Sequence, residues 1–189
     1  MRKAAYWMAD YAYDNQRCCM LKVTTFEDFV DAWNNKIPNS ANTIHLYLHG
    51  GIESLEFYGQ SVDWRFYLEN NAIDLKKVKV FEKVYLNSCN GATLYEYQDY
   101  SESMATHFSR LCPSCEIVAL KDDLVDFFRI TKYTQIPTIT ALDVFLNINN
   151  YYNVYIPVAH EGKGIWVSVT YDEQNDICIT KEIGDTWRL

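Results

Sequence analysis

Glycine and proline are scarce in this chain, with seven and four copies among 189 residues. Disordered or low-complexity chains are usually richer in them, and 49% hydrophobic and 15% aromatic residues supply enough apolar surface for a folded core. Basic residues are also few, since 17 Lys and Arg are scattered among 25 Asp and Glu. The net charge of -8 argues against a general nucleic-acid or anionic-membrane surface, which needs clustered positive charge. We therefore expect a folded globular protein with no nucleic-acid and no membrane partner.

Long apolar runs are missing as well. The N-terminal stretch 1–9 opens like a signal peptide, but Asp10 and Asp14 cut it too short for an apolar h-region. No segment reaches the length of a membrane-spanning helix. The expected location is therefore cytoplasmic.

Cysteine is more frequent, but its six copies form no compact disulfide framework in a chain of this length. Cys112 and Cys115 have the C-x-x-C spacing of a redox motif or a zinc half-site. They lie between a predicted helix and a predicted strand, whereas the thioredoxin motif follows a strand and opens a helix. A second zinc half-site is missing unless Cys18 and Cys19 supply it. We expect the pair to be structural, and we expect no metal and no cofactor.

Two apolar, β-favouring runs each end in a reactive side chain. Residues 44–48 lead into His49 and Gly50, and residues 84–88 lead into Cys89. Both runs are rich in β-branched, aromatic and leucine residues and stop at turn-forming residues, which is typical of short buried strands in a parallel sheet. If the strands are parallel neighbours, about 4.8 Å apart, the imidazole and the thiol stand side by side. Their edge of the sheet is the one at which open α/β sheets bind ligands.

The rest of the chain alternates strand and helix signals. Thr24 and Thr25, followed by Glu27 and Asp28, form a capping-box pattern, and apolar residues then recur at helical spacing until Pro38. Further helices are predicted at 63–71, 101–111 and 138–150. Strand signals occupy 4–13, 18–23, 43–48, 83–88 and 116–120, with hairpins at 53–62 and at 165–171 with 177–182.

These elements predict an α/β fold, a three-layer sandwich with a mainly parallel central sheet and a C-terminal antiparallel hairpin as an appendage. Segments 43–48, 83–88 and 116–120 are expected to be parallel central strands whose C-terminal ends share one edge. The length and the absence of a linker predict a single domain. It spans 1–189, with a core at about 1–125 and an accessory helix and hairpin at about 126–189.

An apolar strand ending in His-Gly, followed by an apolar strand ending in Ser-Cys-x-Gly, resembles the caspase-like cysteine peptidases. This group includes caspases, metacaspases, gingipains, clostripain, CHAT domains and the autoprocessing domains of large bacterial toxins. His49 precedes Cys89 by about 40 residues, and a caspase histidine lies about 50 residues before its cysteine. The resemblance covers about 40–125 and includes the strand that ends in Val-Ala-Leu-Lys-Asp.

The resemblance implies a cysteine endopeptidase with a Cys-His dyad, either an effector or a self-processing module, whose substrate is a protein or peptide. Cys89 would be the nucleophile, and His49 would polarise the site and protonate the leaving amine. The backbone N–H groups of Gly50 and Cys89 would form the oxyanion hole. No obligatory third side chain is implied.

The position that sets specificity departs from the family pattern. Two residues before the cysteine, caspases have a glutamine and clostripain-like enzymes an aspartate, but this chain has Asn87. A preference for aspartate or arginine is therefore not transferable from that position. Asp122 and Asp123, at the end of the third strand, favour a basic residue before the cleaved bond by charge complementarity. The alternative is that they form a solvated turn.

Two other functions stay open. A catalytically inactive caspase-like domain that binds a protein partner fits the short chain and the missing specificity residue. A cysteine α/β-hydrolase is suggested by Leu-His-Gly-Gly at 48–51 and by 87–91, which loosely match an oxyanion motif and a nucleophile elbow. Its triad would need His160 as the downstream base, and its elbow would need a small residue in place of Asn87.

Simpler interpretations of the same residues also exist. A cysteine such as Cys89 is often a small buried hydrophobe, and a strand-end histidine such as His49 often only hydrogen-bonds. His45, inside its strand, is expected to be packed or hydrogen-bonded. His107 and His160 have no motif around them.

Overall fold

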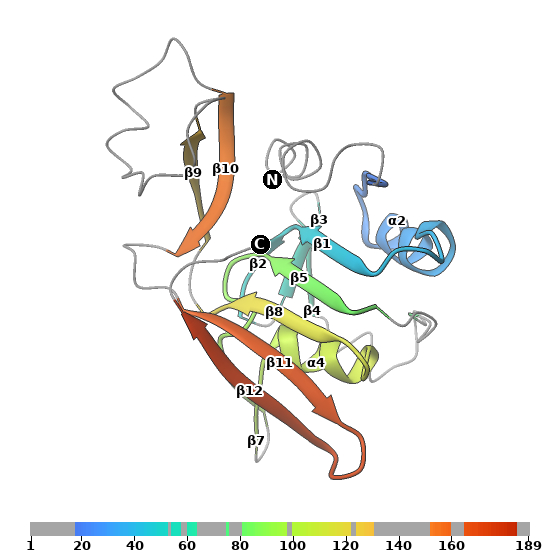
Figure 1. The fold of residues 1–189 in the computed structure, drawn as a ribbon, viewed down its shortest axis with the longest axis vertical. Helices are drawn as coiled ribbons and strands as arrows, with labels where there is room; N and C mark the ends of the chain where they lie inside the picture. Colours follow the sequence, from blue (N-terminus) through green and yellow to red (C-terminus); the bar gives the residue numbers. More distant parts are fainter. Residues whose placement is uncertain are drawn as a thin grey trace.

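The computed structural model describes residues 18–52, 54–57, 60–63, 75, 81–97, 100–121, 124–130, 152–159 and 165–184. These residues form a mixed α/β fold around a five-stranded sheet with the strand order β1-β5-β8-β11-β12 (Figure 1). The strands are β1 (Thr43–Tyr47), β5 (Lys83–Asn87), β8 (Glu116–Leu120), β11 (Trp166–Asp172) and β12 (Ile177–Gly184).

Strands β1, β5 and β8 run parallel, as the sequence predicted. Tyr47 lies opposite Asn87 in the first pair, and Leu86 lies opposite Ala119 in the second. Because neighbouring parallel strands end at the same edge, the segments that follow β1, β5 and β8 all leave the sheet on one side. The prediction of three parallel strands with a shared C-terminal edge is therefore confirmed, but among the described strands β1 is an outer strand of the sheet and not a central one.

The predicted C-terminal hairpin is also present, but it extends the main sheet. Strand β11 pairs antiparallel with β8, with Trp166 opposite Leu120, and β12 pairs antiparallel with β11. The sequence marks the hairpin because its two strands are close along the chain. Its docking on β8 depends on a pairing between distant residues, so local patterns did not predict it.

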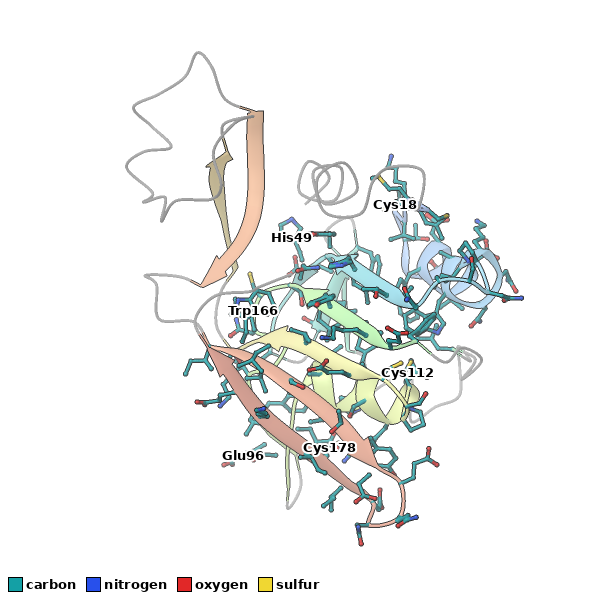
Figure 2. All side chains as sticks on the ribbon, in the orientation of Figure 1. Cys18, His49, Glu96, Cys112, Trp166 and Cys178 are labelled. Carbon is teal, nitrogen blue, oxygen red and sulfur yellow. The ribbon has the colours of Figure 1, made fainter. Side chains whose placement is uncertain are left out.

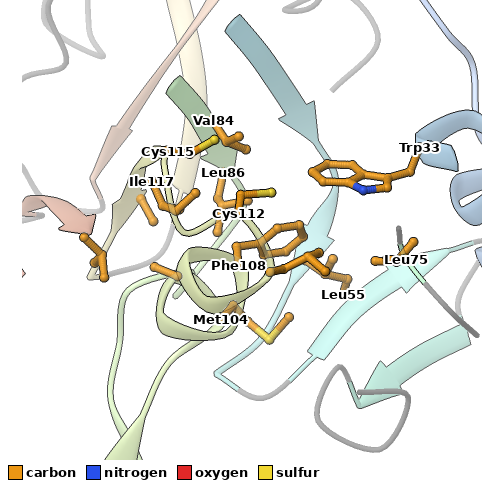
Figure 3. Close-up of a cluster of buried hydrophobic side chains, with 14 of the residues drawn as sticks. Trp33, Leu55, Leu75, Val84, Leu86, Met104, Phe108, Cys112, Cys115 and Ile117 are labelled. Atoms are coloured by element: carbon orange, nitrogen blue, oxygen red, sulfur yellow. The ribbon is translucent and has the colours of Figure 1, made fainter. Parts of the chain in front are cut away.

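The two faces of the sheet are buried differently. Val84 and Leu86 of β5 point to the face that carries the helices and join a large apolar cluster with Trp33 and Phe108 (Figure 3). Tyr85, between them, points to the opposite face. There it belongs to a smaller cluster with the buried side chains Val118, Leu120 and Trp166. This alternation follows from the period of two along a strand.

Two helices cover the first face, and each begins at a capping box. Helix α2 (Phe26–Asp31) is capped by Thr25, whose hydroxyl accepts from the Asp28 N–H while the Asp28 carboxylate accepts from the Thr25 N–H. A π-helical turn, η2 (Ala32–Lys36), continues it and buries Trp33. Helix α4 (Met104–Leu111) is capped in the same way by Ser103 and Thr106.

Three small sheets complete the described residues. Strands β2 (His49–Gly50), β3 (Ser54–Phe57) and β4 (Gln60–Asp63) form an antiparallel sheet, which includes the hairpin predicted at 53–62. Strands β6 (Tyr95–Tyr97) and β7 (Tyr100–Glu102) form a hairpin that the sequence did not predict. Strands β9 (Leu124–Ile130) and β10 (Tyr152–Ala159) pair antiparallel.

Some predicted boundaries differ from the structure. The apolar run 18–23 forms no strand, since it pairs with no described strand, and Met20 and Leu21 are exposed. The helix predicted from residue 101 begins at Met104, because Ser103 caps it and Ser101 and Glu102 belong to β7. The elements predicted at 4–13 and 138–150 lie outside the described residues, as does the helix predicted at 63–71 except for Asp63, which belongs to β4.

Candidate functional site

The parallel pairing of β1 with β5 brings the histidine and cysteine segments to the same edge of the sheet. Tyr47 and Asn87 are the last paired residues, and His49 and Cys89 each follow two positions later. Figure 2 shows His49 at the end of the sheet to which the arrowheads of β1, β5 and β8 point. The juxtaposition that the sequence predicted from two separate motifs is thus present at the level of the backbone.

Gly50 allows the histidine segment and the cysteine segment to pack closely against each other. A Cβ atom built on Gly50 would lie 3.0 Å from Ser88 Cβ and 3.1 Å from the Cys89 carbonyl oxygen. Both distances are shorter than a carbon normally tolerates to a neighbouring atom, and neither neighbour is the far end of a flexible side chain. Only glycine lets the histidine segment approach the cysteine segment this closely.

The chain turns sharply after Cys89, and the turn is held from three sides. Asn90 adopts a left-handed conformation with φ 56°, and its carbonyl accepts from the Thr93 N–H at 3.0 Å. The Gly91 carbonyl accepts from Ala105 N–H in the first turn of α4, at 2.8 Å. Ala92 N–H donates to Leu120 O at the end of β8, at 2.8 Å. These bonds fix the position of the backbone that carries the thiol.

Both reactive side chains reach solvent. His49 is exposed and Cys89 is partly buried. His49 lies in β2 opposite Glu56 of β3, another exposed residue, so an acidic side chain stands across the strand from the imidazole. A solvent-accessible imidazole and thiol at one edge can carry out proton transfer and nucleophilic attack.

Asn87 and Ser88, the two residues before Cys89, are buried polar residues. Asn87 has 0% and Ser88 2% of its surface exposed. In the described part of the chain, the nitrogen and oxygen of the Asn87 amide and the oxygen of the Ser88 hydroxyl have no hydrogen-bond partner. A buried amide without partners costs free energy, and such groups are retained chiefly where they have a role. Asp122 and Asp123, the other predicted specificity residues, lie outside the described residues.

His45 is packed, as the sequence predicted. Its ring stacks on Tyr85 of the neighbouring strand, with 4.4 Å between ring centroids and 6° between ring planes. Burial lowers the pKa of His45 from 6.5 to about 4, because the charged imidazolium loses its hydration there. His45 is therefore neutral at pH 7, and it lies in the middle of β1, not at the C-terminal end of the strand.

A buried polar cluster involving His107 has no sequence motif. Its Nε2 lies 2.7 Å from Tyr95 Oη and 2.8 Å from Glu102 Oε2, and Arg110 pairs with the other oxygen of Glu102. The cluster joins β6 and β7 to α4, so it supports the hairpin that follows the cysteine turn. The sequence feature that could have predicted this cluster is an acidic residue, Glu102, just before a helix that carries His107 and Arg110 three positions apart. His160 lies outside the described residues.

Comparison with protein-family models, with curated proteins and with solved structures finds no match. In the described ranges, no group of three or more His, Cys, Asp and Glu side chains is placed to hold a metal ion. The helices of the same ranges are all too short or too polar to cross a bilayer. The site is therefore characterised by its own geometry.

Proposed function

We propose that this chain is a caspase-like cysteine endopeptidase, a three-layer α/β sandwich that cleaves peptide bonds with a Cys89–His49 dyad. The observation that carries the proposal is the contact of Gly50 with the Ser88–Cys89 backbone. It joins the segment that presents an imidazole to the segment that presents a thiol, at the ligand-binding edge of a parallel sheet. Two strands that ended in these residues by coincidence would not need so close an approach.

In the proposed reaction, the Cys89 thiolate attacks the carbonyl carbon of the scissile peptide. The carbonyl π electrons move to oxygen, and the backbone N–H groups of Gly50 and Cys89 stabilise that oxyanion. When the tetrahedral intermediate collapses, the C–N bond breaks and His49 gives its proton to the leaving amine. A water molecule, deprotonated by His49, then hydrolyses the thioester and releases the acid product and the Cys89 thiolate.

The substrate side of the proposal rests on Asn87 and on the two acidic residues Asp122 and Asp123, which follow β8 along the sequence. The Asn87 amide lies two residues before the nucleophile and keeps its donor and acceptor atoms unpaired within the described ranges. Because this amide is uncharged and buried in the absence of substrate, it supplies no preference for either sign of substrate charge. Asp122 and Asp123 add negative charge, so we expect cleavage after a basic residue.

The test is a peptide-library digest with wild type, Cys89→Ala and His49→Ala. Wild type should cleave, preferentially after Lys or Arg, and both variants should be inactive while keeping the wild-type circular dichroism spectrum. Cys178→Ala is the matched control, since it also removes a partly buried thiol but lies on β12. Cleavage that survives Cys89→Ala would refute the proposed nucleophile, and a preference for aspartate before the cut would refute the proposed specificity.

A further inference from the structure

Cys112 and Cys115 lie at the end of the sheet opposite to His49 and Cys89. Cys112 ends α4 as its C-cap, and Cys115 directly precedes β8. Figure 2 shows Cys112 beside the start of β8, whereas His49 lies at the end where the strands terminate. This pair therefore takes no part in the proposed peptidase site, and its chemistry has to be explained separately.

The four residues Cys112–Cys115 form a tight turn. The Cys115 N–H donates to the Cys112 carbonyl at 2.9 Å, and Pro113 occupies the first central position, where proline is favoured. Such a turn brings its first and last Cα atoms within about 7 Å, which overlaps the range of about 4.4–6.8 Å that a disulfide needs. The backbone is thus already folded to the dimensions of a disulfide.

The two sulfur atoms also interact. A hydrogen bond from Cys112 lowers the pKa of the Cys115 thiol, while burial opposes this shift. The Cys115 Sγ–H donates to the Phe81 carbonyl at 2.9 Å. Both residues belong to the apolar cluster of the helix-bearing face, where Cys112 is 5% and Cys115 1% exposed (Figure 3). No third metal-ligating side chain accompanies them in the described ranges, which disfavours a metal centre.

We propose that Cys112 and Cys115 form a dithiol–disulfide site that exchanges electrons with low-molecular-weight disulfides such as glutathione disulfide. Cys112, the more exposed of the two, reacts first: once its hydrogen bond to Cys115 opens, its proton passes to solvent and its thiolate attacks one sulfur of the oxidant. The S–S bond of the oxidant breaks, one half leaves as a thiolate, and a mixed disulfide forms on Cys112.

Cys115 completes the exchange. Its thiolate attacks the Cys112 sulfur of the mixed disulfide, the Cys112–Cys115 bond forms, and the second half of the oxidant leaves as a thiolate. Two protein thiols are oxidised by two electrons, and the oxidant is reduced to two thiols once the leaving thiolates are protonated. Cys115 no longer has an S–H for the Phe81 carbonyl. The loss of this hydrogen bond opposes oxidation and keeps the disulfide reducible by excess glutathione.

The experiment equilibrates the reduced full-length chain at neutral pH in buffers with defined ratios of glutathione to its disulfide. Samples are quenched in acid, alkylated and digested with trypsin. Cleavage after Arg110 and Lys121 releases peptide 111–121, which contains Cys112, Cys115 and no other cysteine. Peptide 164–181 contains only Cys178 and serves as the internal control, because a single thiol can form no internal disulfide.

We expect peptide 111–121 to lose two hydrogen atoms, to resist alkylation and to recover on reduction. The equilibrium constant for this disulfide should be about tenfold higher in the native chain than in the urea-unfolded chain, since the turn raises the effective concentration of the two thiols. A native peptide that stays fully alkylated, or that retains glutathione without closing the internal disulfide, would overturn the proposal. So would a disulfide that forms only after unfolding.

Two variants test the order of attack. Cys115→Ala should stop at the mixed disulfide on Cys112, and Cys112→Ala should leave Cys115 almost unmodified in the native chain because it is 1% exposed. Equal uptake of glutathione by both variants would contradict the step in which Cys112 reacts first. The wild-type equilibrium requires no substitution, so it tests the disulfide even if a variant does not fold.

Discussion

The two ends of strands β5 and β8 use cysteine in opposite ways. After the strands end, Cys89 sits in a turn that reaches solvent beside the histidine segment. Before β8 begins, Cys112 and Cys115 are buried in the apolar cluster and interact with each other. The reactivity of a thiol depends on its access and its charge environment more than on residue type. In the two proposals, the open edge serves attack on a peptide bond and the buried turn serves exchange with glutathione disulfide.

Replacing the thiol at the open edge should have the largest effect. Cys89→Ala and Cys89→Ser should each lower kcat/KM by at least about 1,000-fold, because alanine has no nucleophile and a serine hydroxyl is far harder to deprotonate than a thiol. Cys115→Ala, at the other end of the sheet, should leave kcat/KM within about twofold in any variant that remains folded, since it lies outside the proposed reaction path. Initial rates on the preferred peptide measure both. An equal loss of kcat/KM in the Cys89 and Cys115 variants would show that the two ends of the sheet do not differ in their role in catalysis.

The second largest effect is expected from the contact between the histidine segment and the cysteine segment. Gly50→Ala places a methyl group 3.0 Å from Ser88 Cβ and 3.1 Å from the Cys89 carbonyl, so the segments must separate. A displacement approaching 1 Å should lower kcat by about 100-fold. The control is Gly51→Ala, whose methyl group meets only the movable Ser54 hydroxyl at 3.2 Å. Similar activity of the two variants would show that the Gly50 contact does not position the dyad.

The stability of the fold should depend on pH through the packed His45 and not through the exposed His49. The folded pKa of His45, about 4, lies below the ordinary value of 6.5. Between these values the unfolded chain binds more protons, so stability is fully present above pH 6.5 and is lost as the pH falls towards 4. A shift of this size corresponds to about 3 kcal/mol.

Urea unfolding between pH 4 and 7 measures this effect. His45→Phe should remove most of the decline on acidification, because phenylalanine can stack on Tyr85 without taking up a proton. His49→Ala is the control, since it removes an exposed histidine and keeps His45 stacked on Tyr85. A decline that His45→Phe leaves unchanged would contradict the assignment.

The smallest expected effect is a difference in labelling rate. Under limiting iodoacetamide at neutral pH, Cys89 should react before the other five cysteines and about tenfold faster than the exposed Cys19, because an imidazole and backbone donors favour its thiolate. Cys112 and Cys115 should react last. Cleavage after Lys83 and Arg110 isolates Cys89 in peptide 84–110 for mass spectrometry.

A matched variant identifies the cause of that rate. His49→Ala should slow the labelling of Cys89 and leave that of Cys19 unchanged, with no change in the circular dichroism spectrum. If Cys89 labels more slowly than Cys19 in wild type, the proposed activation of the thiol is wrong.

Much of the candidate site followed from local patterns. The apolar runs that precede His49 and Cys89, and the turn-forming residues after them, predicted two strands with reactive residues at their ends. The alternation of strand and helix made a parallel arrangement the natural expectation. The sequence could not show that position 50 has room only for glycine. The atoms that exclude a side chain there belong to Ser88 and Cys89, almost forty residues away in the chain. The Glu102–His107–Tyr95 cluster was missed for a similar reason, since it forms only when the β6–β7 hairpin folds onto α4.

The sequence by itself determined the elements whose signals are local. The capping box at Thr25, the apolar runs that become β1, β5 and β8, and the hairpin of β11 with β12 depend on residues a few positions apart, where sterics and hydrogen bonds act directly. Only the tertiary structure decided that this hairpin extends the sheet at β8, that His45 stacks on Tyr85 and loses its charge, and that the Cys112–Cys115 turn is buried. These outcomes depend on which distant surfaces pack together, and burial, which sets both the pKa of His45 and the exposure of each thiol, exists only after that packing is complete.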